Sequence, residues 1–485
     1  MSSCRLPSDP SLENLRKQAK AFLERYRSGE EQTLALVREL DRSPRAGSTF
    51  RLSDAQRATA RLYGFPTWPK LVRHVETIQA LSRSPHRIEV KDAASPAEAF
   101  LLLACLTYGA DDPSRPRRAL EVLASQPGLP ASSIHVAAAA GDVAAVRNLL
   151  ADDGRLASTA GGPHRWDPLL YLAYSRVAPE GCDHLAAAGA LLEEGADPNA
   201  GYLWEGECIF TALTGVFGGG EGGNSQPPHP AGLELARLLL DAGADPNDDQ
   251  TLYNRLFRPD DDHLELLFSY GLGRGHGGPW NRLLGGSPDG PRIMLEDQLL
   301  FASANGFEDR VELLLNHGVD ANGRGSGHPA LRGRSAVELA IETGSGRALQ
   351  ALLSAGAAMP ELDDIDRMLA ALAAGDRGAV EALLARDRTL IGEAIARAPA
   401  RVISAADLGR SEAVRLLVEH GFDVNHRDGR TALHAAAWNG DQAMVELLLS
   451  LGADPTIRDR NHDGTPAAWA RHNGHVELAR RLEAG

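Results

Sequence analysis

A 32-residue unit, Gly429 to Arg460, returns in weaker form through most of this chain. Its first half predicts a short helix from Thr431 to Trp438. A second helix is expected from Gln442 to Ser450, and Gly452 ends it because glycine readily takes the left-handed conformation found at helix C-termini. A fixed period of this size indicates a solenoid, in which each helix pair buries its apolar face only against its neighbours.

Two motifs of this unit resemble those of the ankyrin repeat. Thr431-Ala432-Leu433-His434 is similar to the TPLH element of that family, and Leu447-Leu448-Leu449 with Gly452-Ala453-Asp454 is similar to its LLL…GAD element. The resemblance implies an all-α ankyrin-repeat solenoid of helix-turn-helix repeats with short finger hairpins. It also implies that His434 and His135 form hydrogen bonds between neighbouring repeats. Ankyrin arrays mostly present a concave surface to another protein and need no cofactor.

About eleven such helix pairs are expected in an array over residues 97–485. Glycine-rich insertions interrupt the array near residues 218–230 and near residues 273–290. Insertions in repeat arrays map to one face, which is often the binding face. Surface loops also tolerate extra glycine and proline without any function, so both interpretations stay open for these two segments.

Residues 1–81 lack the repeat and predict a helical N-terminal module. Ser11 is expected to cap its first helix, and Ser53-Asp54 its third. The segment resembles a small helical module that precedes ankyrin repeats in many bacterial proteins, so a protein of bacterial type is expected. Phe65 and Trp68 are expected to cover the apolar face of the first repeat, with a binding hot spot as the alternative. Residues 82–96 are expected to form a linker.

The charge distribution favours a protein partner over nucleic acid. The formal net charge is −15; residues 1–80 hold 14 Lys and Arg against 9 Asp and Glu, or +5, which leaves −20 on the remainder. An acidic array lacks the clustered basic residues that contact phosphates. An acidic groove therefore predicts a partner with a basic or aromatic segment and no binding of nucleic acid.

The cysteines and the chain start predict a cytoplasmic protein. Four cysteines are too few for a disulfide scaffold in a chain this long, so Cys4, Cys105, Cys182 and Cys208 are expected to be buried or half-buried thiols in a reducing compartment. The N-terminus lacks the apolar stretch of a signal peptide, and no run of about 18 apolar residues predicts a membrane span. A monomer without membrane contact is expected, and an exported protein that acts on a host is the alternative.

No metal, nucleotide or cofactor site is expected. The glycine-rich runs lack the lysine and the preceding strand of a phosphate-binding loop. Residues His462, His472 and His475 do not share one helix face, as metal ligands on a helix would. The run Asp260 to His263 resembles the acidic start of a helix, where the helix dipole favours negative charge.

Aromatic residues gather between Trp166 and Phe217, where 7 of the 25 in the chain occur within 52 residues. Exposed tyrosine and tryptophan are frequent hot spots for partners. The first candidate binding residues, expected on the concave or finger surface, are therefore Tyr174, Tyr202, Trp204 and Phe217. Filling of the local core is the alternative for the first three, and the core is the expected place of Trp166, Tyr171 and Phe210.

A second set of candidates occupies the variable positions before the turn glycine of the last two repeats. In the ankyrin frame, Trp438, Asn439, His472 and Asn473 should face the groove. The expected function is that of a protein–protein interaction scaffold whose partner binds the concave or finger surface.

An enzyme or a small-molecule-binding protein is the alternative class. A pocket in the irregular middle of the array, about residues 166–280, could use Asp167, Glu205 or Glu207 as acid or base. A chain with 65 acidic residues contains such pairs by chance. No G-x-S-x-G motif or catalytic cysteine signature is present in the sequence, so no catalytic residue is assigned.

The sequence predicts unequal stability along the array, because each repeat adds its own stability and that of its interfaces. We expect residues 252–268 and 368–384, which diverge most from the repeat, to exchange amide hydrogens faster than residues 429–452. Hydrogen exchange followed by mass spectrometry measures this order, and uniform protection along the array would contradict it.

Overall fold

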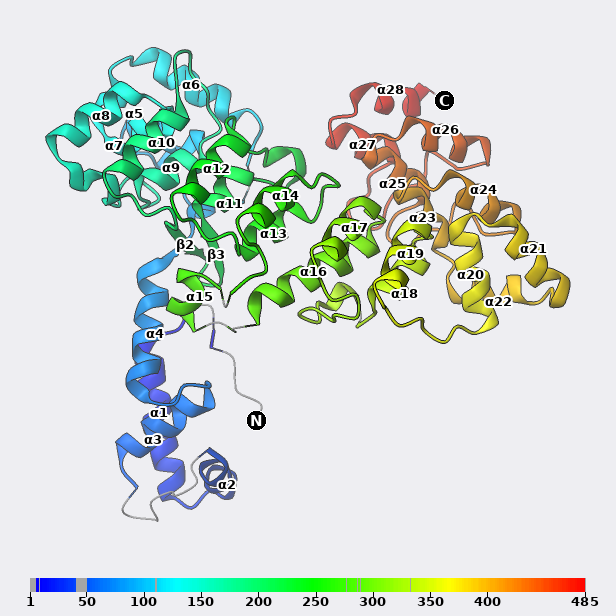
Figure 1. Cartoon of the computed structure of the whole chain (residues 1–485), viewed down its shortest axis with the longest axis horizontal. Coiled ribbons are helices and arrows are strands. Elements are labelled where there is room, and N and C mark those ends of the chain that lie inside the picture. Colours follow the sequence, from blue (N-terminus) through cyan, green and yellow to red (C-terminus); the bar gives the residue numbers. More distant parts are fainter. Residues whose placement is uncertain are drawn as a thin grey trace. The chain divides into compact units, whose positions relative to one another are not determined.

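The computed structural model describes residues 6–7, 9–40, 50–109, 111–275, 277–285, 287, 289–331 and 333–484. Cys4 lies outside these residues, and so does His276 of the second insertion. The chain divides into two compact units, the first Met1–Phe257 with Asp262–Pro288 and the second Arg258–Asp261 with Asp289–Gly485 (Figure 1). Each unit is mostly helical.

The N-terminal segment contains α1 (Leu12–Arg27), α2 (Glu31–Leu40), α3 (Leu52–Leu62) and α4 (Trp68–Leu81). The Ser11 side chain accepts a hydrogen bond from the Asn14 backbone N–H and caps α1, as expected. At α3 the expected cap was wrong, because Arg51 is the N-cap residue and the Asp54 carboxylate accepts from its backbone N–H at 2.9 Å. A carboxylate in the first turn satisfies a backbone donor that the helix itself leaves free.

Phe65 and Trp68 pack against the core of this N-terminal segment itself, which includes Leu15, Leu71 and Val75. The expectation that they belong to the first repeat's apolar face was therefore wrong. Both residues flank the turn between α3 and α4, so the nearest apolar surface is that of their own helices.

The segment after α4 pairs with the array through a small sheet. Ser82–Arg83 (β1) pairs in parallel with Gly201–Trp204 (β2), and β2 pairs antiparallel with Cys208–Thr211 (β3). The β2–β3 hairpin is a finger between two repeats. The expected linker is thus ordered at its start, since backbone hydrogen bonds hold β1 to the finger, and the short turns Pro85–Arg87 (η2) and Val90–Asp92 (η3) follow.

Helix pairs build the rest of the first unit, and the first helices of neighbouring pairs contact one another. The pairs are α5 (Pro96–Ala104) with α6 (Arg115–Ser125), α7 (Ile134–Ala140) with α8 (Val143–Asp152), α9 (Pro168–Tyr174) with α10 (His184–Glu193), α11 (Ala212–Phe217) with α12 (Gly232–Asp241), and α13 (Asp249–Arg255) with α14 (Asp262–Ser269). The acidic run before His263 opens α14 at Asp262, as expected.

The first glycine-rich insertion is packed in the first unit. In residues 218–230, the Gly219 N–H donates to the Gln226 carbonyl at 2.8 Å, and the Arg176 Nε donates to the Pro227 carbonyl at 2.7 Å. Gly218 has φ +59°, and a Cβ there would lie 2.4 Å from the Pro227 carbonyl oxygen, so only glycine fits. The second insertion forms α15 (Pro279–Leu284), which the sequence did not predict.

The second unit continues the helix pairs. They are α16 (Gly290–Ala304) with α17 (Glu308–Asn316), α18 (Ala336–Glu342) with α19 (Gly346–Ser354), α20 (Asp364–Ala374) with α21 (Arg377–Arg386), α23 (Arg401–Asp407) with α24 (Ser411–Glu419), α25 (Ala432–Asn439) with α26 (Gln442–Ser450), and α27 (Pro466–His472) with α28 (Val476–Ala484). The extra helix α22 (Leu390–Arg397), which was not expected, packs on α20.

Buried histidines bond neighbouring repeats, as the resemblance implied. The Nε2 of His434 lies 3.0 Å from the Gly464 carbonyl oxygen of the next repeat, and its Nδ1 lies 2.8 Å from the Thr431 hydroxyl. Because a carbonyl oxygen only accepts, Nε2 carries the proton and Nδ1 accepts from Thr431. His135 makes the matching contact, 2.8 Å from the Thr159 carbonyl oxygen.

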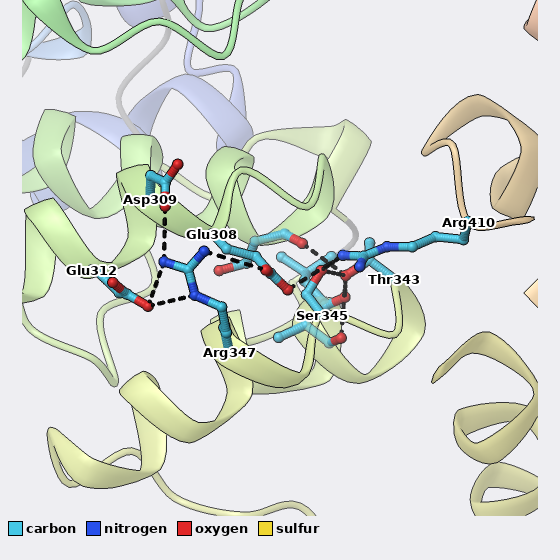
Figure 2. A network of polar contacts seen from close by, with 10 residues as sticks. Glu308, Asp309, Glu312, Thr343, Ser345, Arg347 and Arg410 are labelled. Carbon is cyan, nitrogen blue, oxygen red and sulfur yellow. Dashed lines mark hydrogen bonds and ion pairs between the residues drawn. The ribbon is translucent and has the colours of Figure 1, made fainter. Parts of the chain in front are cut away.

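Arginines join turns of the second unit that lie far apart in sequence (Figure 2). Arg410, just before α24, donates to the Ser345 hydroxyl at 2.8 Å and lies 3.3 Å from the Glu308 carboxylate. Arg347 pairs with Asp309 at 2.8 Å and with Glu312 at 2.9 Å. The α23–α24 pair is therefore tied to the turns of the α16–α17 and α18–α19 pairs.

Among the described residues, Cys105, Cys182 and Cys208 form no disulfide. Cys105 is buried and Cys182 half-buried, as expected, whereas Cys208 is exposed. Over the part of the chain that the structure describes, no helix combines the length and the apolar content that crossing a bilayer would require.

His164 makes the first unit sensitive to acid. It is buried, and its ring lies 4.5 Å from that of Trp166. Burial, with a smaller contribution from Arg115, lowers the pKa of His164 to about 3. The unfolded chain therefore binds a proton near pH 6.5 that the folded unit does not bind, and stability falls as pH drops below that value.

We expect His164→Phe to weaken this pH dependence, because phenylalanine keeps the ring contacts but does not titrate. Between pH 6.5 and pH 5 the stability of the wild type should fall more steeply, by about 1 kcal/mol per pH unit, than that of the variant. Thermal unfolding at several pH values measures the difference. Equal slopes for the wild type and His164→Phe would contradict the prediction.

Candidate functional site

The last two repeats of the second unit contain a hollow of about 520 Å³ with aromatic walls. We call this hollow the aromatic groove, and its lining residues are Arg430, Trp438, His462, Gly464, Ala468, Trp469 and His472. Sequence reasoning had selected two of these, Trp438 and His472, as residues that should face a groove. The structure brings both into one site.

The end of α25 positions Trp438. Gly440 ends this helix at φ +67°, and a Cβ there would lie 2.4 Å from the His475 ring, so glycine is required at this turn. Trp438 in the last turn of α25 is 36% exposed, which is unusual for so large an apolar side chain. Its ring lies nearly parallel to that of His472, with centroids 5.9 Å apart, and at 72° to that of Trp469, with centroids 5.6 Å apart.

Asn439 and Asn473, the other two candidates of this set, bond one repeat to the next. The Asn439 side chain donates to the Asp407 carbonyl at 2.9 Å, and the Asn473 side chain donates to the Trp438 carbonyl at 2.7 Å. Their amides fix the backbone from which Trp438 projects. They therefore position the aromatic groove, whose walls are formed by other side chains.

A buried carboxylate lies behind Trp469. Asp459 accepts hydrogen bonds from the Trp469 Nε1–H at 2.9 Å and from the backbone N–H groups of Asn461, His462 and Gly464, each at 2.8 Å. Burial alone would raise the pKa of Asp459, but these hydrogen bonds hold it well below its usual range. The carboxylate is therefore ionised at neutral pH.

Sequence reasoning missed Arg430, Asp459 and Trp469. Arg430 donates to the Asp407 carboxylate at 2.7 Å, so its charge is paired beside the groove. Trp469 could have been found, because it precedes the selected His472 by three residues and lies on the same side of a helix. Asp459 carries no such signal, since its role depends on how the finger turn folds back onto Trp469.

Three of the four candidates in the first set lie in the core of the first unit. Tyr174, Tyr202 and Phe217 are 0%, 1% and 2% exposed, so they cannot contact a partner in this structure. Their expected place on the concave or finger surface was wrong, and filling of the core was the correct alternative for the two tyrosines. Trp166 stacks on Tyr202 at 5.0 Å and packs against Tyr174 at 4.9 Å. Trp166, Tyr171 and Phe210 are buried, as expected.

Trp204 is half-buried and holds the finger in place. Its Nε1 donates to the Thr107 carbonyl at 3.2 Å, and its ring packs on that of His86 at 4.6 Å. The N–H group and the ring of the Trp204 indole therefore both make contacts within the unit.

The acid–base candidates Asp167, Glu205 and Glu207 do not line the pocket beside the first insertion. Glu205, at φ +50°, accepts from Arg87 and lies 3.1 Å from the His86 Nε2. Glu207 is exposed at the hairpin turn, and burial, together with Asp197, raises the pKa of Asp167. The pocket beside the first insertion holds about 140 Å³, and its polar lining is Asp111, Asp112, Arg115, Arg176, Asn224 and Ser225.

Comparison with known proteins identifies part of the chain. Residues 367–459 match the model of the ankyrin repeats in three copies. Over 67 residues, the chain is 45% identical to an ankyrin repeat protein of Acanthamoeba polyphaga mimivirus. This stretch is 13% of this chain and 9% of that protein. Over 104 residues, the chain is 34% identical to an ankyrin repeat and KH domain-containing protein of Caenorhabditis elegans. This stretch is 21% of this chain and 4% of that protein.

A human ankyrin repeat and SOCS box protein is 40% identical over 68 residues, which are 13% of this chain and 16% of that protein. The chain thus spans less than a fifth of each of these curated relatives. With the matched repeats and the stacked helix pairs together, the fold is an all-α ankyrin-repeat solenoid, as expected.

Trp469→Phe tests the support of the aromatic groove. The change removes the indole N–H donor and leaves the buried Asp459 carboxylate with one hydrogen bond fewer. Because hydrogen bonds to charged groups contribute about 1.5–3 kcal/mol, we expect a loss of stability of that order. Chemical unfolding followed by circular dichroism measures it, and His472→Ala, at an exposed side chain, should change stability by less than about 0.5 kcal/mol. Equal stabilities of the wild type and Trp469→Phe would contradict the assigned role.

Proposed function

We propose that this protein is an interaction scaffold, and that a protein partner docks on the aromatic groove of its last two repeats. Ankyrin repeats, which the chain contains at residues 367–459, generally mediate protein–protein interactions. The observation that carries the choice of site is Trp438, a large apolar side chain that is 36% exposed beside Trp469 and His472. Tryptophans in such hollows supply much of the binding energy of protein interfaces.

The groove is built in advance of binding, which supports this proposal. The Asn439 and Asn473 amides join the backbone of Trp438 to both neighbouring repeats, and Asp459 holds the indole of Trp469. Side chains that are fixed before binding lose little conformational entropy when a partner arrives. The negative charge of the array favours a partner with a basic or aromatic segment.

The double variant Trp438→Ala/His472→Ala tests the proposed site. Leu449→Ala is a matched control, because Leu449 is 39% exposed on the second helix of the same repeat as Trp438. Affinity capture from lysate of the source cells should recover the same partner with wild type and with Leu449→Ala. The double variant should bind that partner about 30-fold more weakly or lose it, since a hot-spot residue contributes about 2 kcal/mol or more.

Binding assays with the captured partner give the affinities. A partner that binds the double variant as tightly as the wild type would move the docking site away from the aromatic groove. A similar loss in Leu449→Ala would indicate a general effect on the repeat and would also contradict the proposed site.

A further inference from the structure

The two indoles of the aromatic groove form a corner that can receive a cation. The rings of Trp438 and Trp469 meet at 72° with their centroids 5.6 Å apart, and His472 lies against Trp438. The face of an aromatic ring carries negative potential, whereas its edge is positive. A guanidinium or ammonium group over such a face is attracted to it, and tryptophan attracts it most strongly.

The charges around the groove also favour a cation. Asp459 is ionised, and its ion-pair contact among the described residues is with the His462 ring, 3.5 Å away, which is charged only when protonated. Arg430 lines the groove but is paired with Asp407, and Arg458 is paired with Asp463 at 3.4 Å. The Asp459 carboxylate therefore adds a negative charge beside the groove that neither of these two arginines pairs with.

Asp459 acts on the groove through Trp469. Its carboxylate accepts the indole Nε1–H at 2.9 Å. A hydrogen bond to an anion polarises the donor group, so the Trp469 ring becomes more negative and attracts a cation more strongly. The geometry and the charge therefore favour the same kind of ligand.

We infer that the aromatic groove holds the arginine or lysine side chain of a basic partner segment against the faces of Trp438 and Trp469. This inference rests on the proposed function. Of the basic or aromatic partner segment expected there, it selects the basic one. A volume of about 520 Å³ lies in the range of sites that bind small ligands, so it has room for a long side chain with adjoining backbone. An aromatic side chain of the partner would bury apolar area in the groove but would gain no attraction from the Asp459 charge.

Short capped peptides Gly-Ser-X-Ser-Gly test the inference on the full chain. The central residue X is arginine, lysine, citrulline, phenylalanine or glutamate, and citrulline has the shape of arginine without its charge. Binding is followed by the indole N–H signals of protein labelled with ¹⁵N-tryptophan, and Trp438→Phe and Trp469→Phe assign the two signals of the groove. The arginine and lysine peptides should shift both signals and bind at least about tenfold more tightly than the citrulline and phenylalanine peptides.

Asp459→Asn tests the positioning role of the carboxylate. Asparagine keeps an acceptor for the indole but removes the charge, so the preference for arginine over citrulline should fall by at least about threefold. Asp463→Asn is the matched control, because Asp463 is exposed, is paired with Arg458 and has φ +53°, a conformation that asparagine tolerates. Its preference should stay within about twofold of the wild type.

The inference is overturned if citrulline or phenylalanine binds as tightly as arginine, if glutamate binds best, or if no peptide shifts the two indole signals at millimolar concentration. If Asp459→Asn fails to fold, the preference of the wild type for arginine over citrulline still decides the question. A partner that needs Trp438 while the peptides show no charge preference would refute the cation and leave the proposed function intact. A partner that ignores Trp438→Ala/His472→Ala would refute the proposed function, whatever the peptides show.

Discussion

The hydrogen bond from His434 to the Gly464 carbonyl crosses from one repeat to the next, and the rest of the array depends on contacts of this kind. The helices that it joins are only 8 and 7 residues long. Helices this short are marginal in water by themselves. They persist because Ala435, Ala436 and Ala437 let neighbouring helices approach closely and bury their apolar faces together. The histidine satisfies a carbonyl that this close approach would otherwise leave buried without a donor.

The same stacking determines where a binding site can form. Core positions of the first helix point at the neighbouring repeats, so only the residues at its end are free to face outward. In α25 these are Trp438, which enters the aromatic groove, and Asn439, which bonds back to the preceding repeat. The site is therefore rigid, because the bonds that join the repeats also hold the backbone of the groove.

Aromatic residues have a different role in the first unit. Its insertions fold onto the array, and β1 adds a strand to the finger, so Tyr174 and Tyr202 are covered. The Trp280 indole donates to the Asn199 carbonyl at 2.9 Å and fastens the second insertion near that finger. Residues of the same type thus fill the core in one unit and line a groove in the other, according to what packs over them.

The sequence by itself determined the helix pairs, the glycine ends and the exposure of Trp438 and His472, because a strict repeat assigns each position to the core, a turn or the groove. It could not place Tyr174, Tyr202 or Phe217, whose repeats contain insertions that no repeat pattern describes. It also could not place Asp459 behind Trp469, or Arg410 beside Ser345 and Glu308, since those contacts join separate turns. Only the tertiary structure decided them, because a side-chain contact between segments depends on how the backbone folds back, which local spacing does not encode.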